Sequence, residues 1–513
     1  MDLPSFILSV VLIILLFLYW FLTRNYNFWE SRGVPCRKQE FLFGNLKDRV
    51  FLKTSFHEFI QDFYKEMKGK PFAGMYEGTR PVLFVLDPDL IKLILVKHFD
   101  HFMDRPVIKY KSEGYLEKMM IALQGNEWKR TRVACTPAFS SGRLKSMVPL
   151  FDTCGKQMIQ YLNRVIDEQG ETTLDIRALL INYTLNSIAS TSFGISIDSY
   201  TDKESEFVKY ALALQDISIF KRIIILITIL YEVPEWITSR LPLSLFNDDS
   251  IRVFTKTLIE TRNARLKNNT RRNDLLQLLL DAQAAPVEVI GETDQEISNE
   301  KRELIDEATA LAQSVFFFVA GFESSSTQLS MACYELAKNK DIQEKARNDI
   351  LSHWPDDNEL TYDVINSMTY LDMVLSETLR LYPPLSRIDR TVTKPIDLNG
   401  LKLDYNMRIA IPASGLHHDP QYYPDPMVFK PERFSQEEKS KRNPYVYLPF
   451  GAGPRNCIGL RFVSISSKIC MAYLLRNYQI DVCDQTPIPF EYHRRAFFLK
   501  AKKPIILKLK KIN

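Results

Sequence analysis

An apolar run of membrane-spanning length lies at the start of the chain. Residues 3–22 are apolar apart from two serines and the small kink that Pro4 provides. Twenty helical residues span about 30 Å, the thickness of the hydrocarbon core of a bilayer. Tyr19, Trp20 and Trp29 suit the aromatic belt at a membrane interface. The pattern predicts a transmembrane helix, and we assign residues 1–24 to an N-terminal membrane anchor.

Charged residues flank this run asymmetrically. Only Asp2 precedes it, whereas the residues that follow include Arg24, Arg32, Arg37 and Lys38. By the positive-inside rule, this distribution leaves the bulk of the chain in the cytosol. A cleaved signal peptide is the alternative, but the run lacks a basic leading region and a small-residue cleavage site. We therefore expect an uncleaved anchor.

The rest of the chain, residues 25–513, is dominated by helical periodicity, and β patterns are short and few. The expected strands are residues 72–76, 82–86, 396–398, 401–403 and 407–411, with Asn399-Gly400 as a hairpin turn. The expected helices include residues 125–134, 145–167, 174–193, 254–267, 274–283, 305–338, 370–382 and 460–475. No repeat or low-complexity segment divides this region. We therefore predict a mainly α fold with small β-sheets, formed as one large domain.

A second apolar segment, residues 217–231, allows two interpretations. Its uncharged part, residues 223–231, is too short to span a bilayer. It could form a buried core helix, or it could lie on the membrane surface as a monotopic contact. The periodicity alone leaves both alternatives open.

Composition and charge restrict the function. The chain has 513 residues, of which 46% are hydrophobic and 25% charged, so it can bury a large core. A net charge of +4 without a basic block argues against nucleic-acid binding. The seven cysteines include no C-x-x-C pair, and no Cys/His cluster has the spacing of zinc ligands. We expect a reducing compartment, no disulfide framework and no zinc site.

One of these cysteines, Cys457, lies in a distinctive loop. The segment at residues 450–459 reads F-G-A-G-P-R-N-C-I-G and directly precedes an expected helix. Backbone N–H groups and the helix dipole at such a junction stabilise a thiolate. Gly453 allows a large flat ligand to approach the backbone, and Arg455 offers a cationic fork for a carboxylate. A buried free thiol is the usual interpretation of a lone cysteine, but the surrounding pattern argues against it.

This spacing, F-x-x-G-x-R-x-C-x-G, resembles the haem-binding loop of the cytochrome P-450 family at every defined position. The resemblance implies the cytochrome P-450 fold, with a single haem domain behind the anchor, and haem b (iron protoporphyrin IX) as the cofactor. Cys457 is then the metal ligand, and its thiolate favours cleavage of the O–O bond. The implied cofactor-binding residues are Trp128, Arg132, Arg390, Phe450, Arg455 and Cys457.

A second family feature is a buried ion triad that supports the haem. Glu377 and Arg380 lie three apart in the helix expected at residues 370–382, so they share one face. Arg433 follows downstream in the segment P-E-R-F. The resemblance implies that these three charges meet under the haem in a structural role.

Proton delivery is expected from the helix at residues 305–338. A glycine inside a helix costs about 1 kcal/mol, so Gly321 needs a reason; without a Cβ it could let this helix approach the haem and admit water or dioxygen. Glu323 and Ser324 resemble the A-G-x-(D/E)-T pattern of the family and are the implied catalytic residues of a proton relay. Ser324 replaces the usual threonine and lacks the methyl that restricts its rotamer, so the coupling of oxygen use to product formation is open.

The resemblance also implies an apolar pocket and an external electron donor. Candidate lining segments are residues 116–123, 316–318, 384–388 and 496–498, and an apolar cavity implies lipophilic substrates. No G-x-G-x-x-G follows a strand, so the chain lacks a nucleotide-binding module. The family uses NADPH-cytochrome P-450 reductase, with cytochrome b5 as an optional second carrier. A docking patch and a solvated face are equally consistent interpretations of Lys129, Arg130, Lys439, Lys441 and Arg442.

Finer matches, at residues 26–35, 139–142 and 320–326, resemble insect microsomal members that metabolise xenobiotics. The implied function is a haem-thiolate monooxygenase of the endoplasmic reticulum membrane, with its catalytic domain on the cytoplasmic side. It would oxidise lipophilic small molecules, such as plant toxins, insecticides, hormones or lipids, with O2 and electrons from NADPH.

Two alternatives remain: a reductase-independent haem-thiolate isomerase or dehydratase, and a non-catalytic membrane protein that binds haem or lipid. The acid and hydroxyl of Glu323 and Ser324 argue against the isomerase. The substrate, its site of oxidation and the oligomeric state do not follow from the sequence.

Overall fold

The structure, a computed structural model, is mainly helical with three small sheets. It describes residues 3–108, 110, 116–202, 204–214, 216–244, 246–272, 274–284, 305–355 and 359–512. Its α-helices are α1 (Leu3–Thr23), α2 (Lys47–Val50), α3 (Phe56–Glu66), α4 (Pro88–Lys92), α5 (Gly125–Cys135), α6 (Ser141–Val165), α7 (Ile176–Ile188), α8 (Glu206–Leu212), α9 (Ile219–Leu230), α10 (Glu235–Thr238), α11 (Asp248–Asn268), α12 (Leu275–Ala284), α13 (Glu307–Lys338), α14 (Lys340–His353), α15 (Tyr362–Ser367), α16 (Thr369–Leu381), α17 (Ala413–His417), α18 (Gln436–Ser440) and α19 (Leu460–Asn477). Its strands are β1 (Phe72–Glu77), β2 (Arg80–Val85), β3 (Glu171–Asp175), β4 (Ile388–Thr391), β5 (Ile396–Leu398), β6 (Leu401–Leu403), β7 (Arg408–Ile411), β8 (Tyr478–Asp481) and β9 (Ile506–Lys511).

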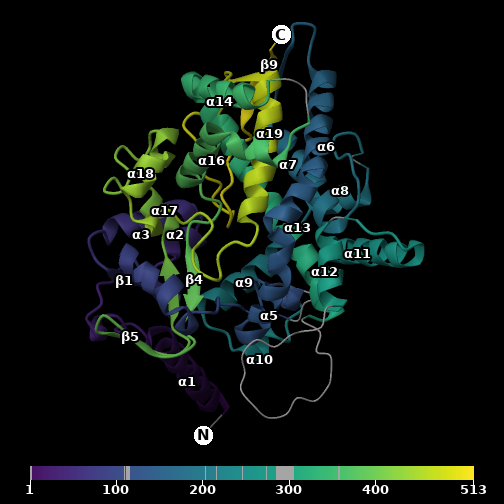
Figure 1. The fold of residues 1–513 in the computed structure, drawn as a ribbon. Coiled ribbons are helices and arrows are strands. Elements are labelled where there is room, and N and C mark those ends of the chain that lie inside the picture. Colours follow the sequence, from purple (N-terminus) through teal and green to yellow (C-terminus); the bar gives the residue numbers. More distant parts are fainter. Residues whose placement is uncertain are drawn as a thin grey trace, which may run out of the picture.

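The largest sheet joins two segments that are far apart in the sequence, residues 72–85 and residues 388–411. Its strand order is β1-β2-β7-β4, and β2 pairs with β7 in parallel, with Leu83 opposite Ile409. Helices α2, α3 and α17 lie beside this sheet, whereas the long helices fill the other side of the molecule (Figure 1). The haem-domain fold expected from the sequence, mainly α with small β-sheets, is therefore confirmed.

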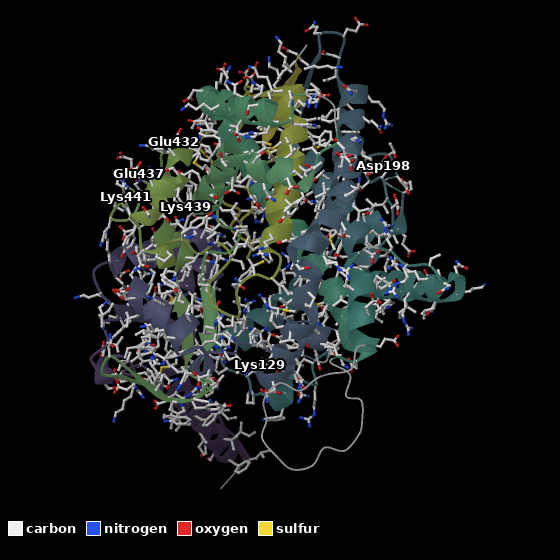
Figure 2. All side chains as sticks on the ribbon, viewed as in Figure 1. Lys129, Asp198, Glu432, Glu437, Lys439 and Lys441 are labelled. Atoms are coloured by element: carbon white, nitrogen blue, oxygen red, sulfur yellow. The ribbon has the colours of Figure 1, made fainter. Side chains whose placement is uncertain are left out.

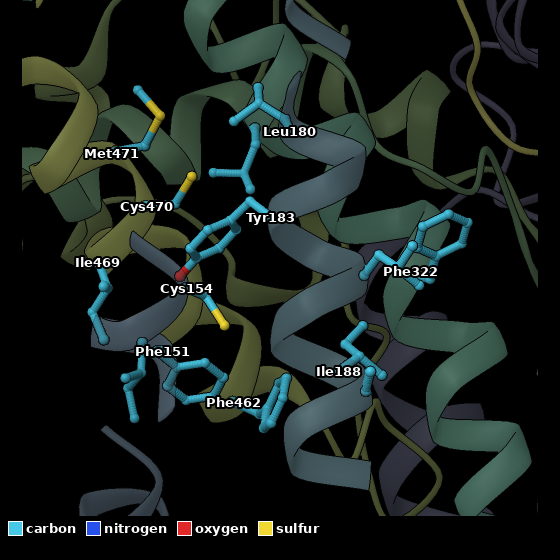
Figure 3. Packing of buried hydrophobic residues seen from close by; sticks show 14 of the residues in the cluster. Phe151, Cys154, Leu180, Tyr183, Ile188, Phe322, Phe462, Ile469, Cys470 and Met471 are labelled. Carbon is cyan, nitrogen blue, oxygen red and sulfur yellow. The ribbon is translucent and has the colours of Figure 1, made fainter. Parts of the chain in front are cut away.

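Helix α13 runs through the centre of the helical side. Asp306 caps its first turn by accepting a hydrogen bond from the Thr309 amide, 2.7 Å away. From Phe322 to Ala337 nearly every side chain is buried, because α13 packs against α7, α12, α16 and α19. Buried residues of α6, α7 and α19, including Phe151, Tyr183 and Phe462, form one continuous core beside it (Figure 3).

Helix α1 stands outside this core. Of its residues only Leu22 is buried, and within the described part of the chain α1 alone is long and apolar enough to cross a membrane. The segment after it is fixed to the sheet by Trp29, which is fully buried and donates from its indole Nε1 to the Met75 carbonyl at 3.1 Å. A Cβ on Gly74 would lie 2.3 Å from that indole, so only glycine fits there. Figure 1 shows α1 projecting from the lower end of the molecule.

Helix α9 is buried on one face only. Ile225, Thr228 and Leu230 are buried against the body, as in a core helix. Its opposite face carries exposed apolar side chains, so a wholly buried helix is wrong. These exposed residues are Ile219, Phe220, Ile223 and Ile227.

Four strands were not expected from the sequence. The helix predicted from residue 174 begins at Ile176, because residues 171–175 form β3 and pair with β9. Strands β4, β8 and β9 were also missed. By contrast, the β5–β6 hairpin has the predicted bounds, with Leu398 opposite Leu401.

Candidate functional site

The loop that carries Cys457 is closed by its own backbone. The Cys457 amide donates to the Phe450 carbonyl at 2.8 Å, which brings the two ends of the expected motif together just before α19. Gly451 and Gly453 have φ angles of 70° and 72°, a region that favours glycine. A Cβ on Gly453 would lie 1.8 Å from the Leu95 carbonyl oxygen, so this loop packs against residue 95 only with glycine at 453.

The Cys457 thiol is exposed, unlike the core cysteines Cys135, Cys154, Cys333 and Cys470. Desolvation by the surrounding protein nevertheless raises its pKa, and hydrogen bonds from the backbone of residues 459 and 460 offset this only in part. A coordinated cation would ionise such a thiol. Within the residues that the structure describes, no group of three or more His, Cys, Asp or Glu could hold a bare metal ion. The haem iron expected from the sequence carries the nitrogen ligands of its porphyrin, so it would need only Cys457 from this loop.

Four arginines converge near this loop: Arg105, Arg132, Arg390 and Arg455. Arg455 donates to the carbonyls of Met103 (2.8 Å) and Leu123 (2.6 Å) and pairs with Asp104 at 3.2 Å. Arg132 donates to the Asn456 carbonyl at 2.9 Å, and Arg105 to the Arg455 carbonyl at 3.3 Å. The Arg455 guanidinium also lies 4.7 Å from the centre of the Trp128 ring, which is buried.

Within this arginine cluster only Arg455 has an ion-pair partner among the described residues, namely Asp104. Burial, followed by the positive charges of Arg105 and Arg455, holds the pKa of Arg390 well below its usual range. Burial and Arg105 likewise lower the pKa of Arg455 to about 9. Arg390 Nε and Nη2 are buried without a hydrogen-bond partner among the described residues. Unpaired donors of this kind are costly, and the two carboxylates of a haem would satisfy them, so the residues fit the cofactor.

Sequence reasoning missed Arg105. The other members of the arginine cluster belong to motifs or follow a recognisable turn, whereas Arg105 lies in a connection before α5 without a local pattern. Its position beside Cys457 depends on the fold, because 352 positions separate the two residues. Only the tertiary structure could identify it.

The structure separates the two implied catalytic side chains of α13. Glu323 is buried and its carboxylate accepts a hydrogen bond from the Arg177 guanidinium at the start of α7. Ser324 is half-buried on another face, and its Oγ donates to the Ala320 carbonyl at 2.7 Å. Ala320 is exposed, although most of α13 is buried. The open face of the helix is therefore formed by Ala320 and Ser324.

Gly321 lies where α13 packs against a neighbouring helix, α7. A Cβ at this position would lie 2.9 Å from Ile188 Cδ1, so the missing side chain lets α7 approach α13. Figure 3 shows Ile188 on α7 directed toward the helix that carries Phe322. Gly321 thus serves helix packing, and Ala320 occupies the open face instead.

The predicted ion triad is confirmed. Glu377 and Arg380 have no exposed side-chain surface and make a two-pronged contact, with N–O distances of 2.7 and 2.8 Å. Arg433 Nε lies 3.4 Å from the Glu377 carboxylate, an ionic contact without hydrogen-bond geometry. Arg380 further donates to the carbonyls of His417 (2.8 Å) and Pro426 (2.7 Å). The triad joins α16 to the later stretch of chain at residues 417–433.

Only one of the three expected pocket-lining phenylalanines, residues 316–318, is not a buried core residue. Phe318 is fully buried in an aromatic cluster with Phe193, Phe254 and Phe322, and Phe317 packs edge-on against Phe139 at 5.1 Å. These two are core residues, so the expectation that residues 316–318 all line a pocket is wrong. Phe316 is half-buried and remains a candidate.

The expected basic patch is divided. Figure 2 shows Lys129 well apart from Lys439 and Lys441, which lie among Glu432 and Glu437. Lys441 is paired with Glu437 and with the following glutamate, at 2.8 Å each. The positive charge near residue 440 is therefore partly neutralised, and Lys129 on α5 belongs to a separate surface.

Comparisons with known proteins agree with this geometry. Residues 34–509 match the family model described as Cytochrome P450. The chain is 36% identical to "Cytochrome P450 9e2" of Blattella germanica over 94% of each chain. It is 34% identical to "Probable cytochrome P450 6a14" of Drosophila melanogaster, covering 99% of this chain and 100% of that protein. It is also 33% identical to "Lithocholate 6-beta-hydroxylase" of Mesocricetus auratus, covering 99% and 97%.

Proposed function

Since the chain belongs to the cytochrome P450 family, we propose the residues and partners through which it works as a haem-thiolate monooxygenase. The family binds haem b through a cysteine thiolate and oxidises lipophilic molecules with electrons from a redox partner. Thiolate-ligated haem, when bound, supplies the chemistry that places one atom of dioxygen in the substrate and reduces the other to water.

Cys457 is the proposed iron ligand, and the arginine cluster with Trp128 is the proposed propionate site. The observation that carries this assignment is the set of unpaired buried donors on Arg390, close to the Arg455 and Arg105 charges. Two carboxylates would pair with these cations and offset their mutual repulsion. Phe450 contributes through its carbonyl oxygen, which accepts a hydrogen bond from the Cys457 amide and so fixes the cysteine loop.

Ser324 Oγ is the proposed donor of protons on the open face of α13, and Glu323 the acid that resupplies it. In the structure the Ser324 proton is directed at the Ala320 carbonyl, and the Glu323 carboxylate is held by Arg177. Glu323 must therefore leave Arg177, or act through water, before it can protonate the serine. A relay with a movable acid fits general acid catalysis, because the proton is delivered only when the side chains align.

NADPH-cytochrome P-450 reductase is the proposed electron donor, with cytochrome b5 as an optional second carrier. The chain has no nucleotide-binding motif of its own, and relatives from the insects Blattella germanica and Drosophila melanogaster support a microsomal system. Lys129 and Arg130, on the exposed side of α5, are the proposed contacts for an acidic partner surface.

The protein is proposed to reside in the endoplasmic reticulum membrane, with residues 25–513 as the catalytic domain on the cytoplasmic side. Helix α1, within residues 1–24, is exposed and apolar, and basic residues follow it. The exposed apolar face of α9 suits contact with the same bilayer. Xenobiotics, hormones and lipids are the proposed substrates, because such compounds partition into membranes.

Substitution of the proposed ligand tests the central assignment. We expect the haem-loaded wild-type protein, reduced with dithionite and exposed to carbon monoxide, to show the red-shifted absorbance band of a thiolate complex. Cys457→Ser should lose this band, because an alcohol does not replace the thiolate. Cys483→Ser, at a half-buried cysteine elsewhere, should keep it. A folded, haem-loaded wild-type protein without the band would contradict the assignment.

Removal of the proposed proton donor tests the relay. We expect Ser324→Ala to lower the product formed per NADPH consumed by about tenfold or more, as measured with any lipophilic substrate found by a product screen. Ser324→Thr should match or exceed the wild-type ratio, because the methyl restricts the hydroxyl rotamer. Ser326→Ala is the matched control, since its hydroxyl donates to the Glu323 carbonyl inside the core. Equal ratios for Ser324→Ala and wild type would exclude Ser324 from the relay.

A further inference from the structure

The end of the membrane anchor meets the globular body at a single carboxylate. Glu232 follows α9 and pairs with Arg24, at the end of α1, with a distance of 3.0 Å between Nη2 and Oε2. Its other oxygen pairs with Arg80, at the start of β2, at 2.7 Å. The exposed fractions of the three side chains are 22%, 31% and 16% for Arg24, Glu232 and Arg80, so the junction is partly shielded from solvent. One acidic group thus connects three segments that are far apart in the sequence.

Backbone contacts reinforce the same junction. The amide of Thr79, in the turn between β1 and β2, donates to the Leu230 carbonyl at 2.8 Å. Asn25, directly after the anchor, donates from its amide side chain to the Thr79 carbonyl at 2.9 Å. A Cβ on Gly78 would lie 2.0 Å from the Leu230 carbonyl oxygen, so this turn reaches α9 only because residue 78 is glycine. The anchor, the β1–β2 turn and the end of α9 are therefore in direct contact.

The backbone of Glu232 indicates that its side chain is required. Its φ angle is 48°, in the left-handed region that favours glycine. Asn269 closes α11 with a similar φ of 49°, and asparagine tolerates this conformation better than glutamate does. A glutamate in a position suited to glycine points to a function for the carboxylate itself.

The two helices joined at this junction both present apolar surface. Nearly all of α1 is exposed, and α9 exposes Ile219, Ile223 and Ile227 at intervals of four residues. Trp236, in α10 just after the junction, is 65% exposed. In Figure 1, α1, α9 and α10 all lie toward the lower end of the molecule.

We infer that Glu232 is a clamp that fixes the membrane anchor to the end of α9, so that both helices meet the lipid surface as one rigid unit. The anchor is then not a free tether, and its direction sets how α9 and α10 rest on the bilayer. The inference rests on the proposal that α1 lies in a membrane, but it does not depend on the oxidation chemistry.

Amide hydrogen exchange of the full-length, haem-loaded protein in phosphatidylcholine vesicles tests the clamp. In Glu232→Gln, which keeps the size but removes the charge, we expect exchange about tenfold faster in residues 24–32 and 219–231. Glu232→Gly should show the same increase, although glycine relieves the backbone. Asn269→Gly is the matched control, because it makes the same backbone change at the end of another helix, and it should leave both segments unchanged.

The arginines provide an independent test in case the Glu232 variants fold poorly. Arg24→Ala should accelerate exchange in residues 24–32 without affecting residues 76–81, whereas Arg80→Ala should do the reverse. If Glu232→Gln, or both arginine variants, exchanged at the wild-type rate, the clamp would be overturned. Glu232 would then be only a residue that follows the end of α9. Vesicle flotation of every sample separates this result from the membrane proposal: failure of the wild-type protein to float would contradict the anchor, and not the clamp.

Discussion

The charge of Glu377 is completely enclosed by protein. Its carboxylate contacts two arginines and also accepts the Lys430 amide at 2.9 Å, and its side chain has no exposed surface. A carboxylate in such a place holds its position only because the surrounding donors replace water. Glu377 is therefore important for stability because its removal would leave Arg380 and Arg433 buried without a counterion.

We expect Glu377→Ala to destabilise the protein by about 3–5 kcal/mol, because it leaves Arg380 and Arg433 buried without a negative partner. Urea unfolding followed by far-ultraviolet circular dichroism measures this loss. The control is Glu437→Ala, which removes the exposed ion pair between Glu437 on α18 and Lys441. It should cause no measurable change in the free energy of unfolding. Equal stability of the two variants would show that the ion triad is not a structural support.

Single residues were predictable where the chemistry is local. The cysteine loop and the Glu377–Arg380 pair could be identified from spacing alone, because the loop closes over eight residues and the pair shares one helical turn. Arg105 and Arg177 were not identified, because their partners are brought to them by the fold. The contact between Gly321 and Ile188 was not predicted for a related reason: the sequence shows that a side chain is missing but not which neighbour uses the space.

At the scale of elements, close packing between helices depends on glycines that differ in what they face. Gly155 of α6 lies against the ring of Tyr473 on α19, where a Cβ would be 2.3 Å from Cδ2. Gly321 of α13 faces only the flexible tip of Ile188 on α7. The first contact involves a rigid ring, whereas the second can relax by rotation of one methyl-bearing group.

We expect Gly155→Ala to destabilise the protein by about 1–3 kcal/mol, since the ring cannot move without disturbing the core. Gly321→Ala should change stability by less than about 1 kcal/mol, because higher helix propensity offsets the contact with Ile188. Both variants can be compared by urea unfolding. Gly321→Ala should also keep full haem content; loss of haem would mean that residue 321 faces the cofactor after all.

Long periodic elements were predictable, and short strands were not. The expected bounds of α13 and α16 agree with the structure within two residues, because each has a sustained apolar face. Strand β9 carries alternating lysines and pairs with β8, about 30 residues earlier, and with β3, more than 300 residues earlier. Such strands are formed by tertiary pairing, which outweighs their weak intrinsic preference.

At the scale of the whole molecule, buried neutral histidines link folding to pH. His57, on α3, contacts the Pro383 carbonyl at 2.9 Å, stacks on Tyr492 and is nearly inaccessible to solvent. Burial is the main reason that its pKa falls to about 4. Between this value and about 6.5, the pKa in an unfolded chain, only the unfolded state binds the proton.

Stability should therefore be fully present above pH 6.5 and be lost as the pH falls toward 4, by up to about 3 kcal/mol for His57. We expect His57→Gln to flatten the dependence of unfolding free energy on pH in this range, as measured by urea titrations at several pH values. Parallel curves for wild type and His57→Gln would contradict this account.

The overall class of the molecule followed from the sequence, but its topology did not. Nothing local indicates that β2 pairs in parallel with β7, more than 300 residues later. The division into an anchor at residues 1–24 and one domain at residues 25–513 stays a prediction. The ion pair between Arg24 and Glu232 indicates that the boundary between the anchor and the domain is held in place and is not a flexible hinge.

The arginine cluster has a consequence for how the protein accumulates in cells. A polypeptide whose cationic pocket is self-repelling gains stability from any dianion that fills it, by mass action. Newly made chains should then persist in proportion to the supply of porphyrin, and chains made in excess should be degraded first. Enzyme abundance would thereby follow cofactor synthesis without a separate regulator, because the arginine cluster, which includes the unmatched donors of Arg390, gains stability when it is filled.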